Sequence, residues 1–167
     1  ADFAFIQHMW KILKDDGRAA IISAQGILFR GKEEKKIRKK LVELDHIEGI
    51  ISLPANLFFV TGIPACVLLL NKQKPPERKN KVIFIYAAND FLDAGKRDFL
   101  RPVDILKIVD IFQNFKEIKK YSHIADLKEI AYNEFNLNIS RYVNLLKDEK
   151  KIDIQKILNN INETTNN

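Results

Sequence analysis

The sequence predicts an α/β layer fold with a largely parallel sheet, followed by a mainly helical C-terminal extension. Two observations predict this class. In the first part of the chain, amphipathic helical patterns alternate with short, almost continuously apolar runs, as is typical of a sheet covered by helices. After about residue 101 the pattern is mainly helical. We therefore divide the chain into an α/β domain over 1–101, a helical extension over 102–147 and a weak helix with a polar tail over 148–167.

The spacing of apolar residues places each element. Phe3, Ile6 and Leu13 recur at helical spacing, and Gly17 ends that helix. The apolar run over 18–23 predicts a strand covered on both faces, and the charged segment 71–81 predicts an exposed, hairpin-like link. The predicted elements are, in order, a helix over 2–14, a strand over 18–23, a helix over 32–44, strands over 47–53, 65–70 and 82–87, helices over 103–120 and 126–132, an extended segment over 135–143 and a weak helix within 148–167.

Composition limits the class of protein. The chain has 167 residues, and its 46% hydrophobic content is enough for a core, which argues against wholesale disorder. The net charge of +6 fits contact with phosphates, although soluble proteins also reach this value without a nucleic-acid partner. One cysteine excludes an internal disulfide, and neither a long apolar run nor a signal peptide pattern is present, so we expect a soluble, cytoplasmic protein.

Residue types that often carry chemistry are scattered. His8, His46, His123 and Cys66 lie too far apart in sequence for a zinc ligand set, so we expect no metal site. The histidines are interpreted as structural or surface residues, and Cys66, inside a predicted strand, as a buried and inert thiol. The adjacent carboxylates Asp15-Asp16 are explained by the turn that they form.

Basic residues are most concentrated around the predicted helix over 32–44. A solvated helix face is the simpler interpretation of this run. Contact with a DNA backbone is the alternative, and binding that weakens with salt would be its signature. The candidates for phosphate contact are Arg30, Lys32, Lys35, Lys36, Arg38 and Lys39.

The loop over 54–64 is unusually apolar for a segment with so many turn-forming residues. It follows a predicted strand, and ligand sites in open α/β sheets gather at the carboxyl ends of strands. An aromatic side chain there could stack on a planar ligand such as a flipped nucleobase, or it could pack under the loop and anchor it. The candidate residues of this loop are Asn56, Phe58, Phe59, Thr61 and Gly62.

Several runs of the chain resemble, in order, the modification subunit of type I restriction–modification systems, an adenine-N6 DNA methyltransferase. The resemblance covers about residues 1–145, and its most specific part is Leu-Pro-x-Asn-Leu-Phe followed by Thr-Gly-Ile-Pro. Tyr86 departs from the family pattern, which favours an acidic residue there. The runs are Asp2-Phe3-Ala4-Phe5-Ile6, Asp16-Gly17-Arg18-Ala19-Ala20, Gly26-Ile27-Leu28-Phe29-Arg30-Gly31, Ile37-Arg38-Lys39-Lys40-Leu41, residues 47–58, Thr61-Gly62-Ile63-Pro64-Ala65 and Asn136-Leu137-Asn138-Ile139-Ser140-Arg141-Tyr142-Val143.

This resemblance implies the C-terminal half of a Rossmann-like, S-adenosylmethionine-dependent methyltransferase sheet. The family transfers a methyl group to the exocyclic nitrogen of an adenine that is flipped out of DNA. It acts together with a specificity subunit that reads the sequence, and often with a restriction subunit. The loop with Asn56, Phe58 and Phe59 corresponds to the family's target-base region, so one of the two phenylalanines is expected to form an aromatic wall for adenine.

The resemblance also implies what is missing. The family positions the weakly nucleophilic amine with an Asn-Pro-Pro-aromatic motif, which works by orientation and electrostatics. That motif, the Gly-rich cofactor loop and the acidic residue expected after the following strand are absent, and Pro75-Pro76 lies in an unrelated charged context. We therefore expect no cofactor binding and no catalysis by this chain alone, and interpret its abrupt start within a helix as truncation, by design or by a split gene.

Two alternatives remain. The chain could be a non-catalytic half-domain that docks with a separate methyltransferase half, or with a specificity subunit, through an exposed sheet edge and the first helix. Self-association through the same edge would support this alternative. A free-standing nucleic-acid-binding domain is the third hypothesis, and it rests on net charge alone.

Overall fold

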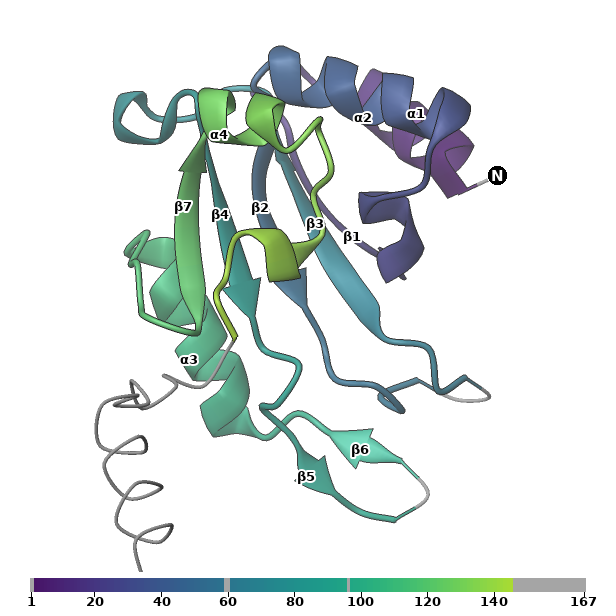
Figure 1. The fold of residues 1–167 in the computed structure, drawn as a ribbon, viewed down its shortest axis with the longest axis vertical. Coiled ribbons are helices and arrows are strands. Elements are labelled where there is room, and N and C mark those ends of the chain that lie inside the picture. Colours follow the sequence, from purple (N-terminus) through teal and green to yellow (C-terminus); the bar gives the residue numbers. More distant parts are fainter. Residues whose placement is uncertain (1, 59–60, 96, 146–167) are drawn as a thin grey trace, which may run out of the picture.

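The computed structural model describes residues 2–58, 61–95 and 97–145 (Figure 1). A mixed α/β fold is observed, as the sequence predicts. The elements are α1 (Asp2–Ile12), β1 (Arg18–Ala24), η1 (Gln25–Leu28), α2 (Lys32–Glu43), β2 (Ile47–Ser52), β3 (Ala65–Asn71), η2 (Pro76–Arg78), β4 (Lys81–Tyr86), β5 (Leu92–Asp93), β6 (Asp98–Phe99), α3 (Pro102–Gln113), β7 (Ser122–Asp126), α4 (Leu127–Tyr132) and η3 (Ile139–Arg141), where η is a 3-10 helix.

Two hydrophobic clusters lie on opposite faces of the main sheet. On one face, α1, α2 and α4 pack over strand residues such as Ile50 and Phe84. On the other face, Ile108 and Ile111 of α3 pack over residues such as Ile83. Because β2 and β4 lie between these layers, β2 is buried on both faces and β4 is buried over residues 82–85, which explains the apolar pair Ile50-Ile51 in β2 and the apolar run Val82-Ile83-Phe84-Ile85 in β4. No described helix is long and apolar enough to span a bilayer.

The prediction of a largely parallel sheet is wrong. The five strands have the order β1-β3-β2-β4-β7, and only β2 and β4 form a parallel pair. The pairs β1·β3, β2·β3 and β4·β7 are antiparallel. The strands β1, β2 and β4 do share one direction, as alternation with helices predicts, but β3 inserts between β1 and β2. Burial on both faces makes a strand apolar whatever its direction, so composition could not show this.

Two predictions about exposure are also wrong. β1 is an edge strand with several exposed residues, including Ile22, and is not covered on both faces. The segment 71–81 is not a hairpin, because β2 lies between β3 and β4. Nor is this link fully exposed, since Asn71 and Lys74 are buried.

The C-terminal part contains less helix than predicted. α3 ends at Gln113 instead of Lys120, and Phe115 and Lys120 both have positive φ, which a helix cannot continue through. Two further features are not among the predicted elements: β7, which pairs with β4 in the main sheet, and the small hairpin β5–β6. The segment predicted as extended over 135–143 contains η3, whereas α4 lies where a short helix is predicted. The weak helix predicted within 148–167 lies outside the described residues.

Candidate functional site

The parallel strands β2 and β4 end side by side, with Ser52 opposite Tyr86. The loop over 53–64 leaves β2 there, and the β5–β6 hairpin follows β4 at the same end of the sheet (Figure 1). Backbone hydrogen bonds tie these segments together: Ala87 N donates to Ser52 O at 3.1 Å and Asp98 N donates to Asn56 O at 3.2 Å. The first bond joins the ends of β2 and β4, and the second holds the loop against the β5–β6 hairpin.

The loop folds back on itself. Asn56 has a φ of 55°, in the left-handed region that asparagine tolerates. A Cβ at Gly62 would lie only 3.0 Å from Asn56 Oδ1, so this close approach favours glycine. Thr61 Oγ1 accepts a hydrogen bond from Ile63 N at 3.1 Å. Three of the predicted site residues thus shape the loop.

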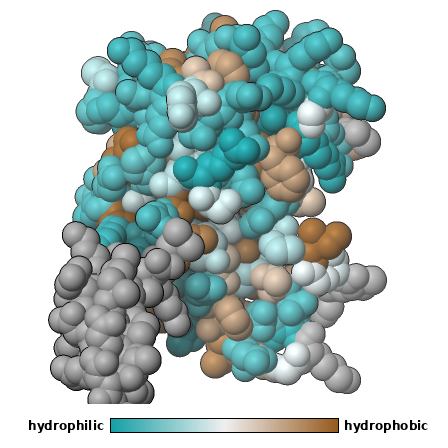
Figure 2. Space-filling view, in the orientation of Figure 1, coloured by the Kyte–Doolittle hydropathy of each residue, from teal (hydrophilic) through white to brown (hydrophobic). Residues whose placement is uncertain are grey.

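Apolar side chains remain exposed on this loop. Phe58 is 37% exposed and Ile63 is 64% exposed. Figure 2 shows apolar side chains beside the loop at this end of the molecule, whereas the end that carries α2 and α4 is mostly hydrophilic. Leu57, next to Phe58, packs against the core instead. One aromatic residue is therefore presented to solvent while its neighbour anchors the loop; Phe59 lies outside the described residues.

A pocket of about 340 Å³ lies at this carboxyl edge. Its polar side chains come from distant parts of the chain, and Gln25 Nε2 donates to Ser52 Oγ at 2.7 Å across its wall. None of the lining residues is charged, so the pocket suits an uncharged ligand with hydrogen-bonding groups. We call this the carboxyl-edge pocket; its lining residues are Gln25, Leu28, Ser52, Leu53, Ala55, Pro64, Tyr86, Ala88, Asn138, Ile139, Ser140 and Leu145.

The C-terminal wall of the carboxyl-edge pocket is fixed by aromatic packing. The Tyr142 ring stacks on Phe84 of β4 with centroids 3.8 Å apart, and Tyr142 Oη donates to Asn136 O at 2.7 Å. Burial raises the pKa of Tyr142, so its hydroxyl remains a donor. Gln25, Ser52, Asn138 and Ser140 were not among the predicted site residues, although Ser52, Asn138 and Ser140 lie within family-like runs and Gln25 directly precedes one.

The predicted DNA-backbone residues differ in accessibility. Arg38 is buried, and its guanidinium donates to the carbonyl oxygens of Ile27, Arg30 and Phe135 at 2.7–3.0 Å. Burial lowers its pKa, and its Nε and Nη1 donors are already used by these carbonyl groups. Arg38 is therefore not available to a phosphate. It is removed from the candidates for contact with the DNA backbone.

The other basic candidates lie at the surface. Arg30, Lys35, Lys36 and Lys39 are ion-paired, with Asp2 at 2.7 Å, Glu134 at 3.0 Å, Glu33 at 2.7 Å and Glu43 at 3.6 Å, respectively. Lys32 is exposed at the start of α2. These five cations lie on or beside one helix and are accessible to an anion, but four of them would have to exchange a carboxylate partner for it.

Histidine and cysteine take structural positions. His46 Nδ1 accepts a hydrogen bond from Trp10 Nε1 at 2.8 Å, and Cys66 is fully buried with its pKa raised to about 12 by burial. His123 lies between Glu117 and Glu129. No group of metal-ligating side chains occurs within the part of the chain that the structure describes.

An uncharged pocket at the carboxyl edge of an α/β sheet, beside a loop with an exposed aromatic residue, is characteristic of α/β enzymes that bind a ligand at the ends of their strands. The N-6 DNA Methylase family matches residues 1–151, so the chain belongs to this family. The fold, the loop and the pocket all lie within the matched region.

Curated relatives and solved structures agree with this family. The type I restriction enzyme MjaVII methylase subunit of Methanocaldococcus jannaschii is 41% identical over 166 residues, which are 98% of this chain and 28% of the relative. The MpnII methylase subunit of Mycoplasma pneumoniae is 34% identical over 163 residues, 98% of this chain and 30% of the relative. The chain thus spans less than a third of each of these relatives.

A crystal structure of the type I restriction-modification system methyltransferase subunit from Streptococcus thermophilus superposes with a TM-score of 0.81 at 41% identity, covering 86% of this chain and 30% of that one. The EcoKI M protein gives a TM-score of 0.69 at 15% identity, over 97% of this chain and 41% of that one, which shows a shared fold alone.

Proposed function

We propose that the chain forms the rear part of a site-specific adenine-N6 DNA methyltransferase, the modification subunit of a type I restriction–modification system. It supplies the C-terminal half of the Rossmann-like sheet and the side of the active site that receives the target base. The observation that carries this proposal is the carboxyl-edge pocket beside the loop with Phe58, within a chain of the N-6 DNA methylase family.

The target base is the ligand that fits this site. Adenine is uncharged and planar and offers hydrogen-bonding groups at its edge, which matches a pocket without charged side chains. Phe58 is exposed on the loop that contributes to the pocket wall and can supply an aromatic surface for stacking, an interaction worth roughly 1–3 kcal/mol per base. The same loop forms part of the pocket wall through Ala55 and Pro64.

The carboxyl-edge pocket does not fit S-adenosylmethionine, the cofactor of the family. That cofactor carries a sulfonium, an amino group and a carboxylate, and no acidic or basic side chain lines the pocket. The sequence also has no Gly-rich loop and no Asn-Pro-Pro-aromatic motif. The cofactor site and the orientation of the amine therefore belong to other parts of the parent enzyme, and the chain alone is inactive.

The exposed cations around α2 are proposed to contact the DNA backbone. Arg30, Lys32, Lys35, Lys36 and Lys39 are the remaining candidates after Arg38 is removed. Neutralising phosphates releases counterions, so each contact steepens the salt dependence of binding by about one unit of slope. DNA, a specificity subunit and a restriction subunit are the partners of the proposed parent enzyme.

The test uses a chimera in which this chain replaces the matching segment of the Streptococcus thermophilus subunit, assembled with that system's specificity subunit. Phe58→Ala should lower kcat/KM for adenine methylation about tenfold, because stacking is lost, whereas Phe58→Tyr should keep most of it. Ile63→Ala is the matched control, since Ile63 is an exposed apolar residue of the same loop. Equal activity of Phe58→Ala and the control would contradict the proposed role of this loop.

The free edge of β1 favours a second candidate function, a non-catalytic half-domain that docks with a separate methyltransferase half. β1 pairs with β3 on one side, and its seven residues carry a single charged side chain, that of Arg18. Native edge strands usually carry charges or bulges that prevent association. The intact mass of the polypeptide in its source cells separates the candidates: a much larger protein with the missing motifs supports the methyltransferase, and a product of about this size supports the half-domain.

A further inference from the structure

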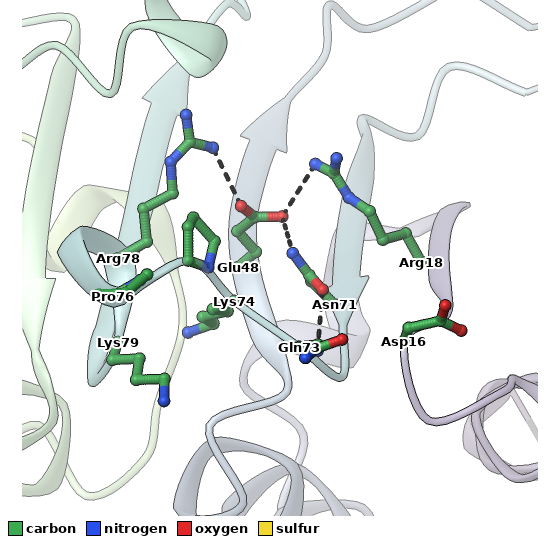
Figure 3. Close-up of a pocket in the computed structure, with 10 residues that line it drawn as sticks. Asp16, Arg18, Glu48, Asn71, Gln73, Lys74, Pro76, Arg78 and Lys79 are labelled. Atoms are coloured by element: carbon green, nitrogen blue, oxygen red, sulfur yellow. Dashed lines mark hydrogen bonds and ion pairs between the residues drawn. The ribbon is translucent and has the colours of Figure 1, made fainter.

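A cluster of charged residues lies near the amino-terminal ends of β1 and β2, at the other end of these strands from the carboxyl-edge pocket. The Glu48 carboxylate is buried and accepts hydrogen bonds from Arg78 Nη1 at 3.0 Å, Asn71 Nδ2 at 3.1 Å and Arg18 Nη2 at 3.2 Å. Figure 3 shows the two guanidiniums approaching Glu48 from opposite sides, one from β1 and the other from η2. Glu48 can neutralise only one of these two positive charges.

A bulge in β2 directs Glu48 into this position. The register between β2 and β3 shifts between Ile47 and Gly49, so Glu48 is the extra residue. Ile47 and Ile50 consequently both face the core, three positions apart. Bulges commonly re-aim one side chain where a strand serves more than its core. Here the bulge frees Glu48 from the core and places it between the arginines.

The two arginines are held differently. Arg78 also donates to Gln113 O at 2.5 Å and stacks over Phe112 and Phe115, so it is fixed against α3. The Arg18 side chain is 60% exposed, and its ion pair with Glu48 uses one nitrogen. The single negative charge of Glu48 is shared by Arg18 and Arg78. The guanidinium of Arg18 therefore has hydrogen-bond donors available to a further carboxylate.

Beside this cluster the surface becomes apolar. A groove of about 350 Å³ runs between the sheet and α3, with Arg18 and Arg78 at its polar end. We call it the arginine groove; it is lined by Arg18, Ile51, Leu69, Arg78, Ile108, Val109, Phe112 and Gln113.

Within residues 2–58, 61–95 and 97–145, no helix covers the part of the sheet face that adjoins the arginine groove on β1 and β3. Ile22 of β1 lies opposite Val67 of β3 on this face and is 58% exposed, and Val109 of α3 is 40% exposed. α3 packs over β4, while α1 and α2 lie on the other face of the sheet. In a layered α/β fold, an apolar sheet face of this kind is covered by a helix.

We propose that the arginine groove and the adjoining face of β1 and β3 receive an amphipathic helix that carries a carboxylate, supplied by the part of the methylase subunit that lies outside the region this chain matches. The apolar side of that helix covers Ile22, Leu69 and Val109, and its carboxylate pairs with Arg18. The relatives provide the length for this segment, because the chain matches only 28–30% of each of them.

The experiment uses the chimeric subunit described above, with a photoreactive benzoylphenylalanine at position 22 or at position 109. Both positions should crosslink to the same peptide, outside residues 1–167, with apolar residues at helical spacing and an Asp or Glu. Phe5, exposed on α1 over the other sheet face, is the matched control position and should not reach that peptide. Arg18→Glu should reduce the crosslink yield at position 22 at least about fivefold, because it places two carboxylates together.

Other outcomes overturn the proposal. A crosslink from position 22 alone would indicate a strand added at the β1 edge, because Val109 lies on α3 and not at that edge. Crosslinks to a second copy, to residues 146–167, or at no higher yield than at position 5 would also exclude the proposed helix. The readout is a peptide mass, so it does not depend on methylation, and a failure here is distinct from a failure of the proposed function.

Discussion

Arg38 Nε donates a hydrogen bond of 2.7 Å to the carbonyl oxygen of Phe135, 97 residues further along the chain. Through Nη1 the same side chain also holds Ile27 O and Arg30 O. One buried cation thus joins α2 to the segments before it and after α4. Replacing it removes the donors of three carbonyl groups at once.

Arg38→Ala should therefore lower the free energy of unfolding by about 3 kcal/mol, because partly buried acceptors lose a charged donor. Lys39→Ala, next to it in sequence, removes an exposed ion pair with Glu43 and a surface contact of the ammonium with the Phe135 ring, and should cost about 1 kcal/mol. Urea denaturation of the two variants measures the difference. Similar stabilities would show that Arg38 does not hold these segments.

Glu48 should also contribute strongly to stability. Glu48→Ala leaves Arg78 facing Arg18 without the buried carboxylate between them, and breaking such a buried pair costs about 3 kcal/mol or more. Arg18→Ala is the control, because the exposed Arg18 can be lost while Arg78 and Asn71 still satisfy Glu48. For Glu48→Ala, the midpoint temperature of thermal unfolding should be well below that of Arg18→Ala, and the reverse order would contradict this account.

His123 should make stability depend on pH. Burial alone would lower its pKa, but Glu129 and Glu117, at 2.9 and 2.8 Å, outweigh burial and raise the pKa above 6.5. The protonated form is therefore favoured in the folded state. Its contribution to stability is complete below pH 6.5 and is lost as the pH rises through the higher pKa of the folded chain.

His123→Gln should remove this dependence, so the stability difference between the wild type and the variant should shrink as the pH rises above 6.5. Unfolding by urea at a series of pH values measures it. The wild type has to be compared with this variant because His46 also titrates. Burial lowers the pKa of His46, so its effect on the pH dependence of stability is opposite to that of His123. A difference that grows with pH would contradict the raised pKa.

Cys66 should be unreactive in the folded chain. With a pKa of about 12, the thiolate fraction at pH 8 is about one in ten thousand, and the side chain is fully buried. Ellman's reagent should label the wild type only after denaturation. Ile22→Cys, at an exposed position of β1, should react promptly under native conditions; rapid labelling of the wild-type chain would show that the core around Cys66 opens.

Much of the local structure was predictable because it depends on neighbouring residues. The apolar face of α1 repeats at helical spacing, and β4 is apolar over residues 82–85 because both of its faces are buried. β7, with the sequence Ser-His-Ile-Ala-Asp, is a short strand at the sheet edge whose pattern gives little signal.

The candidate site was predictable in part. The loop with Asn56, Thr61 and Gly62 follows β2 as the motif indicates, and its shape explains those residue types. The carboxyl-edge pocket was not predictable, since Gln25 and Ser52 meet only after β1, β3 and β2 have paired. The family resemblance identifies the runs that contain Ser52 or border Gln25. It does not show that these two side chains are in contact.

The sequence by itself determined the class of fold, the order of most elements and the family, because apolar periodicity and short motifs are encoded within a few neighbouring residues. Only the tertiary structure decided the direction of β3, the burial of Arg38 and the position of Glu48 between two arginines. The physical reason is that a basic side chain on a helix has the same local sequence whether it meets water or three carbonyl groups. Which of these it meets depends on where distant segments pack.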